Sequence, residues 1–296
     1  MKAALLPDRG VAKVVGGDAR HFLNGLLTAD IGKVTPEHAA FAALLTPQGK
    51  IIVDCIVAEA PAEDGGGFFL DCPRALALTL VQKLNFYKLR AKVVVEDLSE
   101  TLGVLAVWEG VGSTEYGLCY ADPRLAALGL RVMIPPHLAK DTAADLGAEL
   151  VDAKLYDAHR IALGVPRGGL DFTYGDAFPH ETDMDQLNGV DFAKGCYVGQ
   201  EVVSRIEHRG SARTRVVPVA YEGFAPDAGA PVMAAEKSVG TLGSTLDGRG
   251  LALLRLDRAE EAIETGSPLV AGNATLRLIK PDWVRFAFPG LTKAGE

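Results

Sequence analysis

One short stretch of the chain carries chemistry on almost every side chain, residues 194–201, which read KGCYVGQE. A cation, a thiol, a phenol, an amide and a carboxylate follow one another there, with two glycines between them. Buried strands and helices are periodic and mostly apolar, and glycine favours turns and close backbone approaches. The stretch therefore predicts a loop. The next residues, 202–206 (VVSRI), place three apolar side chains on one helical face, so the loop is expected to lead into a helix.

Cys196 is the candidate reactive group of this stretch. It lies near the expected helix N-terminus and two residues from Lys194, and both features stabilise a thiolate over a thiol. A free cysteine is also commonly a small buried residue without chemistry, which is the alternative interpretation. Cys55 and Cys119 lie in apolar strand patterns and Cys72 precedes a proline. No C-x-x-C spacing predicts a metal or cluster site.

Length and charge limit the classes of protein to consider. A chain of 296 residues with 48% hydrophobic residues is expected to fold as two or three globular domains. A net charge of −8 argues against broad, nonspecific nucleic-acid binding. Neither a signal or transit peptide nor an apolar run of membrane-spanning length is evident. We therefore expect a soluble cytoplasmic protein without a disulfide framework.

The first 210 residues mix short strands with a few helices, which indicates an α+β body rather than a regular parallel sheet. Residues 46–50 (TPQGK) have the proline and glycine of a hairpin turn, and residues 167–181 form a long irregular stretch of the kind that is often functional. Strands are expected at 11–15, 41–45, 51–57, 68–72, 91–97, 104–108 and 131–134, and helices at 19–27, 74–84, 140–150 and 151–161.

The chain changes character from residue 214 onward. Short strands recur there between Gly, Pro and Asp turns, a pattern typical of a small all-β barrel or sandwich. We place a domain boundary near residue 210, giving a body over 1–210, expected to have two lobes, and a C-terminal β-barrel over 211–296. The barrel strands are expected at 215–221, 230–233, 239–242, 250–256 and 269–278.

Residues 194–201 resemble the K-G-C-Y/F-x-G-Q-E signature of the folate-binding YgfZ family, which includes mitochondrial iron–sulfur assembly factors. That family is related to the glycine-cleavage T-protein, an aminomethyltransferase. Four further stretches look like segments of the family and occur in the same order, so the resemblance spans nearly the whole chain. They are residues 17–30, the hairpin at 45–50, residues 160–166 (RIALGVP) and residues 250–255.

The resemblance implies a T-protein-like fold, an α+β body in two lobes with a C-terminal β-barrel, and a channel that holds tetrahydrofolate. A flat, polar pterin needs apolar walls and a few fixed polar groups, and Tyr197 and Phe192 are candidates for the walls. The anionic glutamate tail needs a cation, for which Lys194 and Arg205 are candidates. The residues implied to bind the folate are Asn24, Lys194, Gly195, Tyr197, Gly199, Gln200, Glu201 and Arg205.

The chain departs from the T-protein at its acidic residues. The T-protein reads R-L-E-A-G where this chain has residues 160–164, so Ala162 replaces the acid, and nothing like its T-G-Y-T-G-E-D loop lies between Gly103 and Arg131. Aminomethyl transfer would lack its acid–base groups. The resemblance therefore favours a folate-binding accessory protein that supports assembly or repair of iron–sulfur proteins through Cys196. The alternative is a folate-dependent one-carbon transferase.

The expected partners are iron–sulfur client or assembly proteins, with no membrane. Four arginines and a histidine between residues 205 and 215 form a basic run. It indicates either a solvated face between domains or a patch for RNA, and the latter leaves a role linked to tRNA modification open. A bacterial source is expected.

Overall fold

The computed structural model describes residues 1–210 and 212–291. Contacts between residues divide the chain into two compact units. Unit 1 comprises Met1–Tyr156 and Leu187–Val202, and unit 2 comprises Asp157–Gln186 and Val203–Glu296. The expected division into 1–210 and 211–296 stays a prediction. No helix among the described residues is long and apolar enough to cross a membrane.

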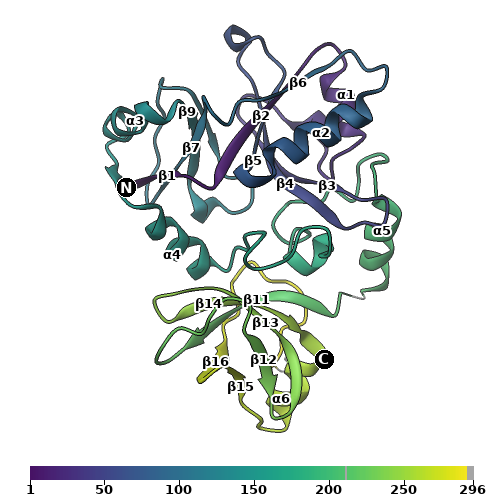
Figure 1. Cartoon of the computed structure of the whole chain (residues 1–296), viewed down its shortest axis with the longest axis vertical. Helices are drawn as coiled ribbons and strands as arrows, with labels where there is room; N and C mark the ends of the chain where they lie inside the picture. The colour runs from purple at the N-terminus through teal and green to yellow at the C-terminus, as the bar shows by residue number, and fades with distance from the viewer. Residues whose placement is uncertain (211, 292–296) are drawn as a thin grey trace. The chain divides into compact units, whose positions relative to one another are not determined.

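Unit 1 contains two five-stranded sheets (Figure 1). The expected hairpin at residues 46–50 is present between β3 and β4, which pair antiparallel. In order across the first sheet, the strands are β10 (Glu149–Leu150), β1 (Lys2–Leu6), β7 (Gly103–Trp108), β9 (Leu130–Ile134) and β8 (Leu118–Ala121). The second sheet runs β3 (Ala40–Leu45), β4 (Ile51–Glu59), β5 (Phe68–Pro73), β2 (Arg9–Val15) and β6 (Val94–Asp97). The helices that begin in unit 1 are α1 (Ala19–Asn24), α2 (Ala77–Lys88), α3 (Ala139–Asp145), α4 (Ala153–Leu163) and α5 (Gln200–Arg209).

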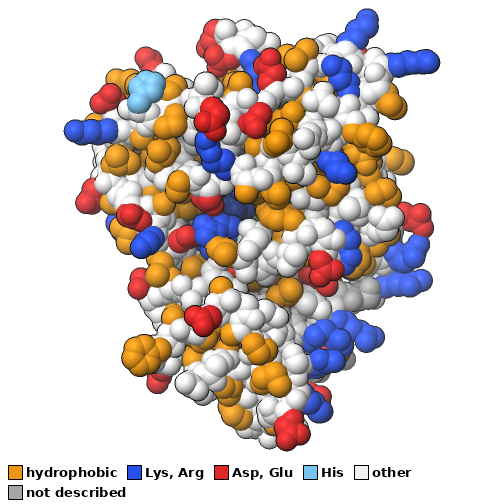
Figure 2. Space-filling view, viewed as in Figure 1, with side chains coloured by type: hydrophobic (Ala, Val, Ile, Leu, Met, Phe, Trp, Pro, Cys, Tyr) orange, Lys and Arg blue, Asp and Glu red, His pale blue; other side chains and the backbone are white. Residues whose placement is uncertain are grey.

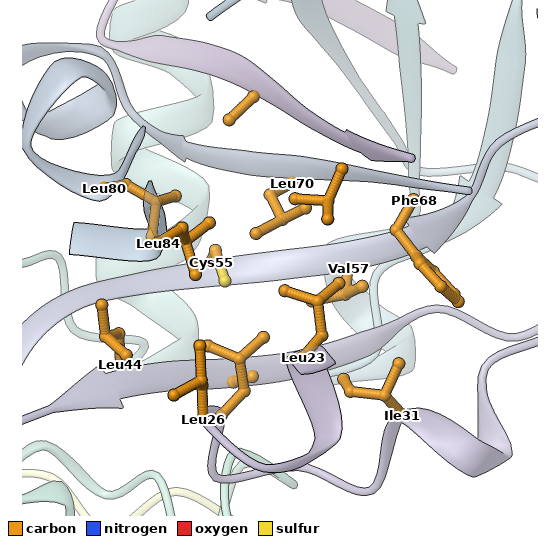
Figure 3. Packing of buried hydrophobic residues seen from close by; sticks show 14 of the residues in the cluster. Leu23, Leu26, Ile31, Leu44, Cys55, Val57, Phe68, Leu70, Leu80 and Leu84 are labelled. Carbon is orange, nitrogen blue, oxygen red and sulfur yellow. The ribbon is translucent and has the colours of Figure 1, made fainter. Parts of the chain in front are cut away.

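The main core of unit 1 lies where α1 and α2 pack on the second sheet. Leu23 of α1 and both Leu80 and Leu84 of α2 are fully buried. They belong to one cluster with Leu44 and Leu70 from the strands (Figure 3). Burying each such side chain stabilises the fold by about 1.5–3 kcal/mol, so this cluster fixes the end of α1, on which the candidate site depends.

A buried ion network joins the two sheets of unit 1. Asp71 on β5 accepts from Arg9 of β2 and from Arg131 of β9, both at 2.6 Å. Arg131 also contacts Asp122 at 2.8 Å, and Asp122 in turn contacts Arg124 at 2.7 Å. Burial alone raises the pKa of Asp71, but the two arginines outweigh it and hold that pKa below its usual range. Each charged side chain of the network is thus stabilised by the opposite charges next to it.

Unit 2 contains a closed antiparallel barrel, as the sequence predicted. Its core is formed by small and branched side chains from the strands and by the buried face of α6 (Leu256–Glu264). Around the barrel the strands are β11 (Thr214–Tyr221), β14 (Arg249–Arg255), β13 (Lys237–Leu246), β12 (Pro231–Ala234), β15 (Leu269–Ala271) and β16 (Ala274–Leu278).

The helix expected over 19–27 ends at Asn24 and the strand expected over 91–97 begins at Val94. Two further predictions are wrong, both where a glycine turns the chain. The helix expected over 140–150 ends at Asp145, because Gly147 adopts φ +65° and the chain turns into β10. The strand expected over 269–278 is two strands, since Gly272 at φ +55° lets it fold back on itself. Strands β1 and β8 and helix α6 were not anticipated.

Candidate functional site

The signature stretch forms an irregular loop in unit 1 that leads into α5 at Gln200. This confirms the expected loop-to-helix arrangement. Cys196 lies four residues before the first residue of α5, outside the first helical turn, to which the effect of a helix dipole is confined. The setting of Cys196 therefore depends on the contacts that hold the loop.

Lys194 is the anchor of the loop. Its Nζ atom lies 2.7 Å from each of three backbone carbonyl oxygens, those of Asn24, Leu27 and Ala29. An ammonium group has three N–H donors and no acceptor, so these carbonyls use its whole hydrogen-bonding capacity. The lysine ties the signature loop to the end of α1 and to the residues that follow it. Its expected role as the cation for an anionic folate tail is not supported by this geometry.

The charge state of Lys194 matches these contacts. Burial lowers the pKa of Lys194 to about 8, while Asp30 and Asp191 act in the opposite direction. The ammonium therefore persists at neutral pH. It also lies 5.1 Å from the centre of the Tyr197 ring, within the range of a cation–π contact. Burial raises the pKa of Tyr197 to about 12, with Asp191 adding to the effect, so the phenol stays neutral beside the cation.

The loop packs against the β3–β4 hairpin through two glycines. Gly199 has φ +83°, and a Cβ atom there would lie 2.6 Å from the carbonyl oxygen of Thr46. Gly49 in the hairpin has φ +82°, and its Cβ would lie 3.0 Å from Val202. Both positions need a residue without a side chain. The TPQGK and KGCYVGQE motifs thus meet in space.

Gly199→Ala is expected to lower the free energy of unfolding by about 3 kcal/mol, because it adds left-handed backbone strain and a clash with a backbone oxygen. Gly195→Ala is the matched control, since a Cβ at Gly195 meets no heavy atom within 4 Å. Its effect should stay within about 0.5 kcal/mol. Urea unfolding measures both variants, and equal midpoints would refute the proposed packing.

Two further residues, Thr28 and Asp191, hold the loop, and the sequence did not predict either role. The Thr28 hydroxyl donates to the carbonyl of Gly189 at 2.6 Å and accepts from the amide of Ala43 at 2.8 Å. Asp191 accepts from Lys33 Nζ at 2.5 Å and from a backbone amide two residues later. A threonine that is fully buried must have such partners, but its partners cannot be inferred from the sequence.

Cys196 is the exposed thiol of the chain. All four cysteines lie in described residues, and Cys55 and Cys72 are buried while Cys119 is half-buried. Burial raises the pKa of Cys72 to about 12 and that of Cys55 well above its usual value, so both stay protonated. The interpretation of Cys196 as a buried core residue is wrong. An accessible thiol on a fixed loop can act as a nucleophile, a redox group or a metal ligand.

The other residues expected to bind folate are spread over the loop and α5. The Asn24 side-chain oxygen accepts from the amide of Ile31 at 2.9 Å, so this oxygen supports the end of α1. Gln200 is half-buried, and Glu201 and Arg205 are exposed on α5. The role expected for Arg205, the cation for an anionic tail, stays a prediction. The pairing expected between Glu201 and Arg205 stays a prediction.

One group in the described ranges has the spacing of metal ligands, His180, Asp185 and Glu207 in unit 2. His180 Nε2 lies 3.0 Å from Glu207 Oε2. Both oxygens of Asp185 accept from Arg215, at 2.8 and 2.9 Å. This guanidinium already supplies the positive charge that a metal ion would bring. The group is therefore best explained as ion pairing that fixes residues 179–186, which begin with the 3-10 helix Pro179–Thr182, to β11 and α5.

Comparisons with known proteins agree with this architecture. Residues 213–286 match the family described as CAF17, C-terminal beta-barrel domain. The aminomethyltransferase T of the glycine cleavage system from Bartonella henselae superposes with a TM-score of 0.75 at 17% identity, covering 96% of this chain and 86% of that protein. This similarity concerns the fold and confirms the predicted T-protein-like α+β body with a C-terminal β-barrel.

The related sequences are named as mitochondrial iron–sulfur cluster assembly factors. The mouse protein IBA57 is 33% identical over 310 residues, which cover 94% of this chain and 84% of the mouse protein. The human IBA57 is 31% identical over 94% of this chain. An IBA57 homologue from Mycosarcoma maydis is 34% identical over 74% of this chain, and the match spans 57% of the fungal protein.

These relatives refine the expectations from sequence. The expected link to iron–sulfur assembly factors is confirmed, and the family is IBA57, which is related to the YgfZ proteins named above. Neither a bacterial source nor a role in tRNA modification finds support, because the relatives are named as eukaryotic mitochondrial factors. The cytoplasmic location stays a prediction. The chain belongs to the IBA57 family of iron–sulfur cluster assembly factors.

Proposed function

We propose that this chain is an accessory factor in the assembly of iron–sulfur proteins and acts through the thiol of Cys196. The observation that carries the proposal is the exposure of this one cysteine on a loop that Lys194 and Gly199 fix in place. The three hydrogen bonds of the Lys194 ammonium and the close packing at Gly199 hold the loop, so the thiol stays in one position. The names of the relatives indicate the kind of substrate, an iron–sulfur cluster.

One cysteine limits what the site can do with a cluster. Clusters are commonly held by about four protein ligands, and Cys196 supplies one. The thiol gives up its proton when its sulfur binds iron. The remaining ligands must come from a partner protein or from small thiols. The chain therefore acts on a cluster in a shared, transient complex and does not store one by itself.

A cluster with small thiol ligands tests the proposal on the purified protein. A [2Fe–2S] cluster bound by glutathione is added to wild type, Cys196→Ser and Cys119→Ser. Ligation by a chiral protein site should give the cluster a circular dichroism signal in the visible range in wild type and in Cys119→Ser. In Cys196→Ser this signal should fall at least tenfold, which corresponds to a loss of about 1.4 kcal/mol in the free energy of cluster binding. An unchanged signal in Cys196→Ser would exclude this thiol as the ligand.

We also propose that the chain binds tetrahydrofolate or a derivative of it. The support is the fold, which is that of an aminomethyltransferase, together with the signature residues. Tyr197 is buried and neutral, which suits a wall for a pterin. Within residues 1–210 and 212–291 the Asn24 side chain is bonded through its oxygen, which leaves its amide hydrogens for the polar edge, and Gln200 is half-buried at the start of α5. Lys194, whose three donors contact backbone carbonyls, supports this site by holding the loop.

Titration of tetrahydrofolate separates binding from thiol chemistry. We expect saturable binding to wild type and to Cys196→Ser. Arg205→Ala should bind about tenfold more weakly, because a charge-assisted contact contributes about 1.5–3 kcal/mol. The matched control is Arg209→Ala, one turn further along α5. Absence of saturable binding to wild type would refute the folate proposal and leave the thiol proposal standing.

Folate-dependent one-carbon transfer is the second candidate function. It is supported by the fold alone. The acid of the T-protein helix end is replaced by Ala162, which removes a group that acid–base catalysis needs. Turnover of methylene-tetrahydrofolate by the purified protein would favour this candidate over the accessory role.

A further inference from the structure

Helix α2 presents large apolar side chains to solvent as well as to the core. Leu80 and Leu84 are fully buried beneath it. On the outer side, Leu78 is 61% exposed, Phe86 74% and Leu89, the residue after the helix, 90%. Residues 78 and 86 are eight positions apart, about two helical turns, and both face outward, while Leu89 is exposed where the helix ends. A helix that only packs on its own sheet needs one apolar face, and the second has no function in folding.

The same segment is strongly basic. Residues 73–95 contain five lysines and arginines and no acid, in a chain whose net charge is −8. Lys83, Arg90 and Lys92 are exposed, and no ion pair involves them within residues 1–210 and 212–291. Figure 2 shows apolar and basic side chains next to one another over the region that α2 occupies in Figure 1. Local charge of this kind attracts an acidic surface.

The backbone at Leu89 adds an independent observation. Leu89 has φ +43° and ψ −103°, a conformation that costs a residue with a side chain about 1–3 kcal/mol. Strain in a folded protein is usually offset by contacts that the strained residue makes. Leu89 makes few, because nine-tenths of its surface is exposed. The turn that ends α2, in which the amide of Ala91 donates to the carbonyl of Lys88 at 2.8 Å, imposes this backbone and holds the Leu89 side chain outward.

We propose that this surface, the α2 patch of Leu78, Phe86 and Leu89 with Lys83, Arg90 and Lys92, binds an acidic face of a partner protein. Resting on the proposed function, the partner is the iron–sulfur protein that receives a cluster from this chain. Exposed aromatic and arginine side chains are enriched at protein interfaces, and an apolar centre beside cations fits an apolar pocket rimmed by carboxylates.

A protein fits the α2 patch better than a lipid surface. Helices that lie in a membrane interface bury one continuous apolar face in the lipid. On α2 the polar residues Gln82 and Asn85 are also exposed on the outer side and interrupt that face. Phe86 and Leu89 are separate protruding anchors of the kind that enter pockets on a protein partner.

The test combines photocrosslinking with activity in cells that lack the chromosomal copy of the gene. A photoreactive phenylalanine analogue is placed at Phe86, with the 99% exposed Phe224 of unit 2 as the control position. Two sets of changes are compared, Leu89→Gly, and Lys83→Glu with Arg90→Glu and Lys92→Glu. Mass spectrometry identifies the crosslinked peptide, and the activity of a cluster-dependent enzyme is measured in the same cells.

We expect a partner crosslinked from position 86 through an acidic segment and absent from position 224. The charge reversal should lower the crosslink yield roughly tenfold, as loss of electrostatic steering does, and lower enzyme activity at least threefold. Leu89→Gly should also lower the crosslink yield and the enzyme activity. Its melting temperature should equal that of wild type or exceed it, because glycine relieves the strained φ. A residue needed only for folding would show the opposite change in melting temperature.

Three outcomes would overturn the proposal. They are full enzyme activity in the charge-reversed variant, a crosslinked segment without acidic residues, and binding of the purified protein to vesicles of anionic phosphatidylglycerol that the charge reversal abolishes. Cys196→Ser separates this proposal from the proposed function. If Cys196→Ser lowers enzyme activity and the patch variants do not, the α2 patch alone is excluded. If Cys196→Ser has full activity, the thiol proposal fails.

Discussion

Lys194→Met is expected to lower the free energy of unfolding by about 3 kcal/mol. The change keeps most of the side-chain volume and removes three donors. The carbonyls of Asn24, Leu27 and Ala29 would then lack a partner, and each buried polar group without a partner costs about 1–3 kcal/mol. The contacts share one ammonium, so the losses are not additive. Denaturant unfolding gives the magnitude.

Hydrogen exchange locates the effect of Lys194→Met. The amides of residues 24–30 and 190–199 should exchange faster in the variant, because these two segments lose the tie between them. Lys154→Met is the control, since its side chain is exposed and no ion pair involves it within residues 1–210 and 212–291. We expect that control to cost at most about 1 kcal/mol. Equal stability of the two variants would show that Lys194 does not anchor the loop.

Arg131→Met should destabilise the protein by about 3–5 kcal/mol, the range for breaking a buried ion pair. Its guanidinium contacts both Asp71 and Asp122 and connects the two sheets of unit 1. Each carboxylate keeps one arginine in the variant but loses the other. Arg255→Met is the matched control because its pair with Asp257 is exposed. It should cost at most about 1 kcal/mol.

The effect of Arg131→Met should depend on pH in a defined direction. Burial raises the pKa values of Asp71 and Asp122, but neighbouring arginines outweigh burial and hold both below the usual range. The carboxylates therefore stabilise the folded state fully above the unfolded pKa of about 3.9, and this contribution falls as the pH drops below it. The difference between wild type and Arg131→Met should narrow below about pH 4. If the difference in the free energy of unfolding between the two proteins does not change with pH, the buried ion network is contradicted.

The fold was predictable because its signals are local. Alternating apolar residues and glycine turns indicated the strands of the body and the barrel. Predictions from local sequence were wrong where a glycine could either continue an element or end it. Gly147 ends a helix that the pattern would have continued, and Gly272 divides a strand. Helix α6 was not predicted because the Gly, Pro and Asp turns that recur from residue 214 onward favour short strands.

The candidate site was predictable in its residues but not in their roles. The density of polar chemistry in residues 194–201 located the loop, and Cys196 is exposed as a reactive group requires. The role of Lys194 depends on carbonyls more than 160 residues away in the chain, at Asn24 and Leu27. No pattern in the sequence encodes which backbone oxygens a lysine will meet. For the same reason, the pairing of Gly199 with the hairpin was not anticipated.

The central claim is that a fixed loop presents Cys196 for work on iron–sulfur clusters. Its most direct test is the activity of cluster-dependent enzymes in cells whose only copy of the protein is wild type, Cys196→Ser or Cys119→Ser. We expect Cys196→Ser to accumulate and fold like wild type but to fail to support those enzymes, while Cys119→Ser supports them. Full enzyme activity with Cys196→Ser would show that the thiol of Cys196 is not needed for work on iron–sulfur clusters.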